Sequence, residues 1–307
     1  MARRKHGEPV HGWVTLDKPL GMTSTAAVSA VKRLYNARKA GHAGTLDPLA
    51  TGVLPIALGE ATKTVSFAMD GRKAYRFTVR WGEETNTDDA EGEVVNSSAA
   101  RPSRSDIEAV LPRFTGTIAQ APPRFSAIKV AGERAYDLAR EGEVVELEPR
   151  QVEVLDLRLV EVPDADHATF EAECGKGTYV RALARDLGRA LGCLGHVSAL
   201  SRTRVGPFTA EHMIPLEKLE ALRHKDAGRE ALKEWLLPVE TALDDIPALA
   251  VGSAEAARLK QGQAVLVRGR DAPLNQDTVL VVWRGQPIAV ASLSQGAIKP
   301  KRVFNLD

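Results

Sequence analysis

The sequence has few of the features that mark secreted, metal-binding or membrane proteins. Its two cysteines, Cys174 and Cys193, lie far apart and in no CxxC or Cys/His spacing. We therefore expect reduced thiols, with neither a disulfide nor a metal site. No apolar stretch approaches the ~20 residues of a membrane helix, and no apolar run follows the basic N-terminus as in a signal peptide. These absences predict a cytoplasmic protein with no membrane partner.

The net charge of the whole chain is also small, at +1, and taken alone it disfavours a nucleic-acid partner. The balance hides a strong polarity along the sequence: residues 1–80 carry +8, residues 81–173 carry −12, residues 174–214 carry +4 and the remainder carries +1. A polyanion can bind a face built from the two basic segments. Charge blocks can equally mark solvated faces, and the composition leaves both interpretations open.

The length of 307 residues indicates two domains, or one large domain with an appendage. Strands and helices occur without a regular βαβ rhythm, so the expected fold class is α+β with a mixed, largely antiparallel sheet flanked by helices. We place the catalytic domain at residues 1–244 and a small, mostly β module at 245–307. Expected strands are 13–16, 53–58, 74–81, 152–162, 168–174, 200–208, 265–268, 279–283, 288–293 and 302–304; expected helices are 24–35, 105–115, 133–140, 179–191 and 253–260, and residues 214–243 are expected to be largely helical. Thr23 or Ser24 is expected to cap the first helix and Ser105 the second, residues 164–167 to form a hairpin turn, and residues 37–52 to form a long loop.

The most unusual segment is a glycine-rich stretch at residues 41–54 that precedes an apolar run. It lacks the GK[ST] of a phosphate-binding loop and the GxSxG of a hydrolase elbow. Within it, Asp47 stands before Pro48, which disfavours helical geometry and allows the carboxylate to project from a turn. Asp47 can be a functional carboxylate, or it can cap its own turn.

Two further patterns carry chemically versatile side chains. Residues 175–181 place two glycines before a helix whose first turns hold Arg181 and Arg185 on one side, off the apolar stripe. Such arginines can bind a carboxylate or phosphate, but pattern alone favours a solvated helix face. Tyr75 lies in an expected strand, where a tyrosine belongs to the core more often than to a site.

Taken together, these motifs resemble the TruB family of tRNA pseudouridine synthases. The resemblance rests on the ordered blocks Asp17-Lys18-Pro19-x-Gly21-x-Thr23-Ser24, the glycine-rich stretch around Asp47, Lys73-x-Tyr75, the Thr85-x-Thr87-x-Asp89-x-x-Gly92 turn, Gly177-Thr178-Tyr179-Val180-Arg181 and Leu200-x-Arg202. It covers roughly residues 10–240. Several ordered motifs make a far stronger signal than any single one.

The resemblance implies the pseudouridine synthase fold, with a PUA-like C-terminal module that binds RNA. It also implies isomerisation of the uridine at position 55, in the T loop of tRNA, to pseudouridine. Asp47 matches the catalytic carboxylate, Arg181 the arginine that pairs with it, and Tyr75 the aromatic that stacks on the uracil. Tyr179 and Leu200 match residues that contact the flipped base, and His42 a residue near the space the base leaves. Lys18 matches a residue that supports the catalytic loop. No metal or redox cofactor is implied.

Other functions of the same sequence are an RNA chaperone that remodels tRNA, or a guide-dependent pseudouridylase of the same superfamily. We favour a stand-alone enzyme that acts as a monomer on the tRNA T stem-loop without guide RNA. On this interpretation the two basic segments meet around Asp47, and the acidic residues lie mainly away from the bound tRNA.

Overall fold

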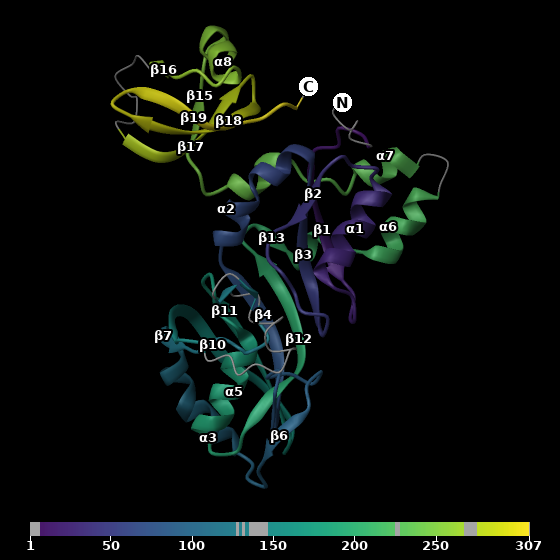
Figure 1. Cartoon of the computed structure of the whole chain (residues 1–307), viewed down its shortest axis with the longest axis vertical. Helices are drawn as coiled ribbons and strands as arrows, with labels where there is room; N and C mark the ends of the chain where they lie inside the picture. Colours follow the sequence, from purple (N-terminus) through teal and green to yellow (C-terminus); the bar gives the residue numbers. More distant parts are fainter. Residues whose placement is uncertain are drawn as a thin grey trace.

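The computed structural model describes residues 7–126, 129–130, 133–134, 147–224, 228–266 and 275–306. Figure 1 shows an elongated molecule in which a long sheet carries most of the α-helices, and a smaller sheet with α8 lies at one end. The long sheet has the order β14-β1-β3-β12-β4-β11-β10-β7, with β2 paired to β3 and β13 to β12. Its strands are β1 (Gly12–Lys18), β2 (Ala40–His42), β3 (Ala50–Leu58), β4 (Lys73–Trp81), β7 (Gly116–Gln120), β10 (Arg150–Asp164), β11 (His167–Cys174), β12 (Gly195–Val205), β13 (Phe208–Thr209) and β14 (Ile214–Pro215).

Most pairings in this sheet are antiparallel. Among the described strands of the long sheet, β1 with β14 and β3 with β12 are the parallel pairs. The expected α+β class and the mixed, largely antiparallel sheet are therefore confirmed. The order β3-β12-β4 brings three segments that lie far apart in the sequence side by side at the centre of the sheet.

Helices cover the two halves of the sheet and close two apolar cores. On the β1–β3 half, α1 (Ser24–Leu34), α6 (Leu216–Arg223) and α7 (Gly228–Lys233) contribute to one core with β1 and β3. On the other half, α3 (Arg104–Val110) and α5 (Val180–Ala190) pack over β4, β10 and β11. The predicted apolar stripe of α5 is buried, and each such aliphatic side chain stabilises the fold by ~1.5–3 kcal/mol.

Several local predictions are confirmed and others are wrong. Thr23 caps α1 by accepting from the Ala26 amide at 3.1 Å, and the β10–β11 hairpin turns at 164–167 as expected. The cap of α3 is Ser103, in a capping box with Asp106, and not Ser105, because only Ser103 stands three residues before a carboxylate that reaches its amide. Helix α2 (Val65–Asp70) was not predicted, since its single turn is too short for a periodic signal.

The expected loop at residues 37–52 contains β2 and the start of β3, because pairing with β1 and β12 extends the strand into the glycine-rich stretch. The expected helix at 133–140 begins as strand β9 (Glu133–Arg134), paired with β8 (Lys129–Val130). Residues 135–140 lie outside the described residues. The acidic turn region is flanked by the small hairpin of β5 (Glu83–Thr85) and β6 (Val94–Ser97).

In its described residues, 248–266 and 275–306, the C-terminal module is a five-stranded sheet with one helix. Its elements are β15 (Ala248–Ala250), α8 (Ser253–Lys260), β16 (Val265–Leu266), β17 (Asn275–Trp283), β18 (Gln286–Ser294) and β19 (Ala297–Val303). It joins the rest of the protein through an apolar cluster in which Phe304 packs with Trp13 and Phe208. Lys63 also donates to the Val303 carbonyl at 2.7 Å. None of the helices in the described ranges is long and apolar enough to cross a bilayer.

Gly52 is required where β3 meets β12. Its φ is +94°, and a Cβ atom there would lie 2.3 Å from the Arg202 carbonyl oxygen. Gly21 has a similar φ of +78° but no atom within 4 Å of a built Cβ. We expect Gly21→Ala to lower the free energy of unfolding by about 1–2 kcal/mol from backbone strain alone, and Gly52→Ala by about 3 kcal/mol or more. Urea unfolding followed by circular dichroism measures both, and equal losses would contradict the packing argument.

Candidate active site

A cavity of about 740 Å³ opens where the glycine-rich loop, β4, the acidic turn and the start of α5 meet. Its wall includes Tyr75 from β4, Tyr179 and Arg181 from the start of α5, and Arg202 from β12. The lining residues are Gly44, Thr45, Asp47, Pro48, Met69, Lys73, Tyr75, Thr87, Asp89, Glu91, Phe125, Ser126, Lys176, Gly177, Thr178, Tyr179, Arg181 and Arg202. The cavity therefore brings together residues of five of the six sequence motifs.

Hydrogen bonds from Ser24 and Lys18 hold the loop that carries Asp47. Ser24 Oγ donates to the Leu46 carbonyl at 2.9 Å and accepts from the Leu46 amide at 2.8 Å. Lys18 Nζ donates to the Pro48 carbonyl at 3.3 Å and to the Met22 carbonyl at 2.6 Å. These bonds pin the residues on both sides of Asp47, whose side chain remains 39% exposed toward the cavity.

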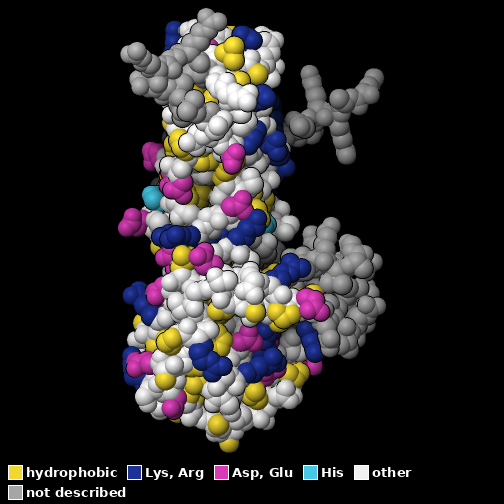
Figure 2. Space-filling model, turned by 90° about the vertical axis from the view of Figure 1, so that its left-hand side faces the viewer, with side chains coloured by type: hydrophobic (Ala, Val, Ile, Leu, Met, Phe, Trp, Pro, Cys, Tyr) yellow, Lys and Arg dark blue, Asp and Glu magenta, His cyan; other side chains and the backbone are white. Residues whose placement is uncertain are grey.

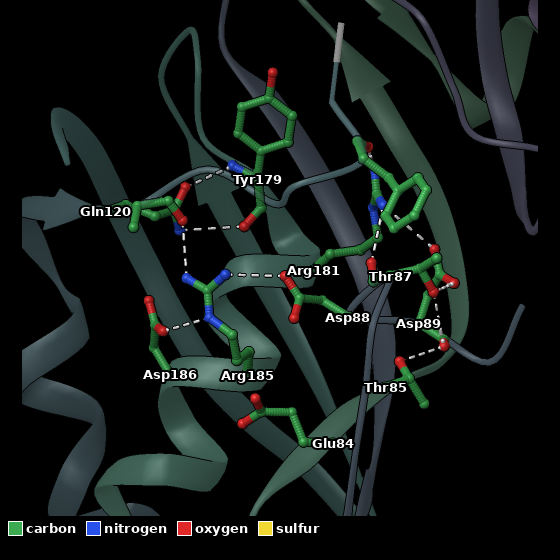
Figure 3. Close-up of polar contacts among 12 residues, drawn as sticks. Glu84, Thr85, Thr87, Asp88, Asp89, Gln120, Tyr179, Arg181, Arg185 and Asp186 are labelled. Carbon is green, nitrogen blue, oxygen red and sulfur yellow. Dashed lines mark hydrogen bonds and ion pairs between the residues drawn. The ribbon is translucent and has the colours of Figure 1, made fainter. Parts of the chain in front are cut away.

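Arg181 holds the carboxylate from the side of α5. Its Nε lies 3.0 Å from Asp47 Oδ2, and its Nη1 lies 3.5 Å from Asp89 Oδ2. The same guanidinium donates to the carbonyls of Thr87 and Phe125, both at 2.9 Å. With the side chain only 8% exposed, the guanidinium is fixed by its acceptors, as Figure 3 shows for the labelled partners. The orientation of Asp47 follows from this fixed group.

The next arginines of α5 continue the same arrangement. Arg185 lies 2.9 Å from Asp88 and 2.9 Å from Asp186, and also donates to the Ala121 carbonyl at 2.8 Å. One turn further, Arg189 pairs with Glu84 at 2.6 Å. The expectation of a solvated face for Arg181 and Arg185 is wrong, because the acidic turn folds over the helix and supplies counter-ions (Figure 3). We call Arg181, Arg185 and Arg189 the α5 arginine ladder.

Tyr75 and Tyr179 form aromatic walls of the cavity. Tyr75 on β4 is almost fully buried, and burial raises the pKa of its phenol. Tyr179 precedes α5, where Gln120 accepts from its amide at 2.8 Å and donates to its carbonyl at 3.1 Å. Burial also raises the pKa of Tyr179. Both phenols are therefore neutral at physiological pH and offer flat faces to a planar ligand.

Three predicted site residues lie outside the lining. Lys18 is fully buried beneath the loop, and burial lowers its pKa against the attraction of Asp47. His42 lies half-buried on β2 opposite Ile56, and burial lowers its pKa as well. Leu200 on β12 packs against both apolar cores. The structure thus places Lys18 as a support of the loop and does not bring His42 or Leu200 to the cavity wall.

Sequence reasoning missed five charged residues that line the cavity: Lys73, Asp89, Glu91, Lys176 and Arg202. Three of them stand in the quoted motifs, which was the available signal. Basic residues from both basic segments meet Asp47 here, but Asp89 and Glu91 of the acidic segment do so too. Figure 2 likewise shows the two signs of charge interspersed over one face. In the described part of the chain, no group of three or more His, Cys, Asp or Glu side chains is arranged to hold a metal ion.

Solved structures identify the class of protein that this fold and site define. The chain is similar to a protein in the "Crystal Structure of a Cbf5-Nop10-Gar1 Complex", with a TM-score of 0.74 and 27% identity over 96% of this chain and 85% of that one. A second likeness, to the "archaeal box H/ACA sRNP Nop10-Cbf5 complex", has a TM-score of 0.74 and 25% identity over 99% and 93% of the two chains. The class is that of the pseudouridine synthases.

The sequence comparisons give the family. Residues 32–180 match "TruB family pseudouridylate synthase (N terminal domain)", and residues 181–244 match "tRNA pseudouridylate synthase B C-terminal domain". A protein of Bradyrhizobium diazoefficiens named "tRNA pseudouridine synthase B" is 66% identical over 99% of this chain and 88% of its own length. Another of that name, from Agrobacterium fabrum, is 56% identical over 98% and 97%. The chain belongs to the TruB family of pseudouridylate synthases, which confirms the resemblance seen in the motifs.

Proposed function

We propose that this enzyme converts the uridine at position 55, in the T loop of tRNA, to pseudouridine. The observation that carries the proposal is the Asp47–Arg181 pair beside Tyr75 in a cavity whose wall also holds Lys73 and Lys176. The relatives named "tRNA pseudouridine synthase B" support tRNA as the substrate.

The reaction breaks the N1–C1′ bond, turns the uracil and forms a C5–C1′ bond. N1 gains a proton and C5 loses one, so atoms and electrons balance without a redox partner. The Asp47 carboxylate acts as a nucleophile at the base or at the ribose, or assists elimination at the sugar, and Arg181 orients it. Because Asp47 sits on a loop pinned on both sides, the attacking oxygen is placed before the substrate enters.

The uridine must leave the T loop to reach the cavity. Base extrusion costs a few kcal/mol, and stacking on an aromatic face returns ~1–3 kcal/mol per base. Tyr75 supplies that face, with Tyr179 on the α5 side of the same cavity. In this proposal Leu200 and His42 contact the base or the space it leaves only after the RNA or the protein rearranges.

The division of labour along the chain is part of the proposal. Residues 1–244 form the catalytic domain, and residues 245–307 form a PUA-like module that binds another part of the tRNA. The exposed basic residues Lys299, Lys301 and Arg302 on β19 support this role. The enzyme acts as a monomer without guide RNA.

Tritium release from tRNA labelled with [5-³H]uridine tests the activity, since C5 loses its hydrogen in the reaction. We expect release by the purified protein alone, and none from a transcript in which uridine 55 is replaced by cytidine. Release that requires added guide RNA would favour a guide-dependent enzyme. Tight tRNA binding with no release would favour the RNA chaperone.

Lys73 makes tRNA binding depend on pH. Its Nζ donates to the carbonyls of Met69 and Gly71, both at 2.6 Å, and burial, reinforced by the nearby Arg202, lowers its pKa to about 8. The ammonium is charged below this pKa and neutral above it, so tRNA affinity should fall as the pH rises from 7 to 9. Lys73→Met should weaken binding at pH 7, reduce the salt slope by about one and flatten the pH profile.

Lys73→Arg is the matched control, because arginine keeps its charge throughout this range. Fluorescence anisotropy with labelled tRNA at fixed ionic strength measures the affinity. The same fall between pH 7 and 9 in Lys73→Arg would assign the pH dependence to another group.

A further inference from the structure

Arg202 is a buried cation for which the proposed function has no use. It lies on β12 with 1% of its surface exposed, yet it reaches the cavity wall. In the described part of the chain its guanidinium is held by carbonyls and not by a carboxylate. Nε donates to Val53 at 2.9 Å, Nη2 to Gly44 at 3.0 Å and Nη1 to Thr45 at 3.3 Å. A buried charge is costly, so a site that keeps one has a use for it.

The strand register places this cation between the two catalytic elements. Arg202 pairs with Gly52 on β3 and with Tyr75 on β4. Its carbonyl acceptors Gly44 and Thr45 precede Asp47 by three and two residues on the same loop. On the other side, the guanidinium interacts with the phenol of Tyr75. The planar guanidinium of Arg202 thus contacts both the loop that carries Asp47 and the side chain of Tyr75.

This geometry favours one orientation of the Tyr75 hydroxyl. A guanidinium only donates hydrogen bonds, so the phenolic oxygen next to it must accept. The three carbonyls fix the position of the guanidinium. The guanidinium in turn fixes where the phenolic oxygen of Tyr75 accepts its hydrogen bond. Lysine cannot reproduce this, since a single ammonium does not span acceptors on both sides.

We propose that Arg202 is a positioning residue, which sets the phenol of Tyr75 at a fixed place relative to Asp47 for the isomerisation. This proposal rests on the proposed function, since Arg202 acts through a residue of that reaction. It differs from a purely structural role, in which Arg202 would only hold the loop and would act independently of the Tyr75 hydroxyl.

A double-mutant cycle separates the two roles. The single-turnover rate constant and the tRNA dissociation constant are measured for wild type, Arg202→Lys, Tyr75→Phe and the double variant. We expect Arg202→Lys to lower the rate constant about 30-fold or more, with the dissociation constant changed less than about threefold. In the Tyr75→Phe background the same change should cost less than about threefold. Equal losses in both backgrounds would overturn the proposal.

Arg204→Lys is the matched control. Arg204 lies two residues further along β12, pairs with Glu173 at 2.6 Å and does not line the cavity. We expect it to keep the wild-type rate constant within about threefold. An equal loss in this variant would mean that any arginine change on β12 disturbs the strand, which would also overturn the proposal.

A second measurement requires no tRNA. The chain has four tyrosines, so ¹³Cζ-tyrosine labelling gives four resonances, and Tyr75→Phe assigns one by its loss. In Arg202→Lys the Tyr75 resonance should move while the other three stay, and an unmoved resonance would overturn the proposal. The resonance shift is measured on the enzyme without tRNA. It therefore tests the Arg202 proposal even if the wild-type enzyme fails to modify tRNA, so the two failures are distinguishable.

Substituting a buried cation can unfold the protein, so the experiment includes a replacement variant. If circular dichroism shows Arg202→Lys to be unfolded, Arg202→Gln replaces it, since it keeps amide donors without a buried charge. If both unfold, the reverse measurement decides: Tyr75→Phe alone should shift one of the solvent-protected arginine Nε–H signals of the wild type. No shifted arginine signal would overturn the proposal.

Discussion

Asp47→Asn is expected to abolish pseudouridine formation, with a loss of about 10³-fold or more in the single-turnover rate. The change keeps the size of the side chain and removes its nucleophilic oxygen. The loop should stay in place, because Ser24 and Lys18 hold it through backbone atoms of Leu46 and Pro48. Tritium release from [5-³H]uridine-labelled tRNA measures the rate.

Affinity for tRNA should survive the same change within about tenfold, since Asp47 contacts no phosphate in this scheme. Filter binding at a fixed salt concentration checks this. Undiminished tritium release by Asp47→Asn would remove Asp47 from the chemistry. A large loss of binding with an unchanged rate in the saturated complex would assign Asp47 to RNA recognition instead.

Arg181→Lys is the prediction with the next largest effect. The guanidinium serves four acceptors on Asp47, Asp89, Thr87 and Phe125, and a lysine ammonium cannot reach them in one geometry. We expect the single-turnover rate to fall about 100-fold or more, with tRNA affinity held within about tenfold. The free energy of unfolding should also fall, because a buried network loses part of its pairing.

Arg185→Lys is the control for the structural part of that effect. Arg185 is equally buried on the same helix, pairs with Asp88 and lies outside the cavity wall. Both variants should lose stability in urea unfolding, but Arg185→Lys should keep the rate within about tenfold. If the two variants lose the same activity, Arg181 matters for folding and not for aiming Asp47. Equal losses of rate and affinity in Arg181→Lys would instead make Arg181 an RNA contact.

The resemblance of the ordered motifs to a known family identified Asp47, Tyr75 and Arg181, whereas the local pattern around each residue did not favour a functional role. The structure brings all three to one cavity. Helix α5 and the β10–β11 hairpin were also predicted, since an apolar period of 3.6 or 2 is written into their own residues. Local signals of this kind depend on no distant partner.

The features that could not be predicted from the sequence depend on contacts between distant segments. Arg202 looked like one more strand arginine, and its position at the cavity follows from the parallel pairing of β12 with β3, which no local pattern predicts. Arg185 looked solvated because its counter-ion, Asp88, stands 97 residues away in the sequence. In the same way, acidic residues of the segment 81–173 pair with the arginines of α5, which the charge of each segment does not reveal.

The α5 arginine ladder has a consequence for how RNA binding is driven. Its arginines fasten the turn that carries Asp88 and Asp89 to the helix that carries Arg181. The conformational entropy of ordering this wall is therefore lost when the chain folds and not when RNA arrives. In the proposed function, the free energy of the contacts with the RNA is then available to open its folded loop. We therefore expect the main conformational change on binding to occur in the RNA and not in the enzyme.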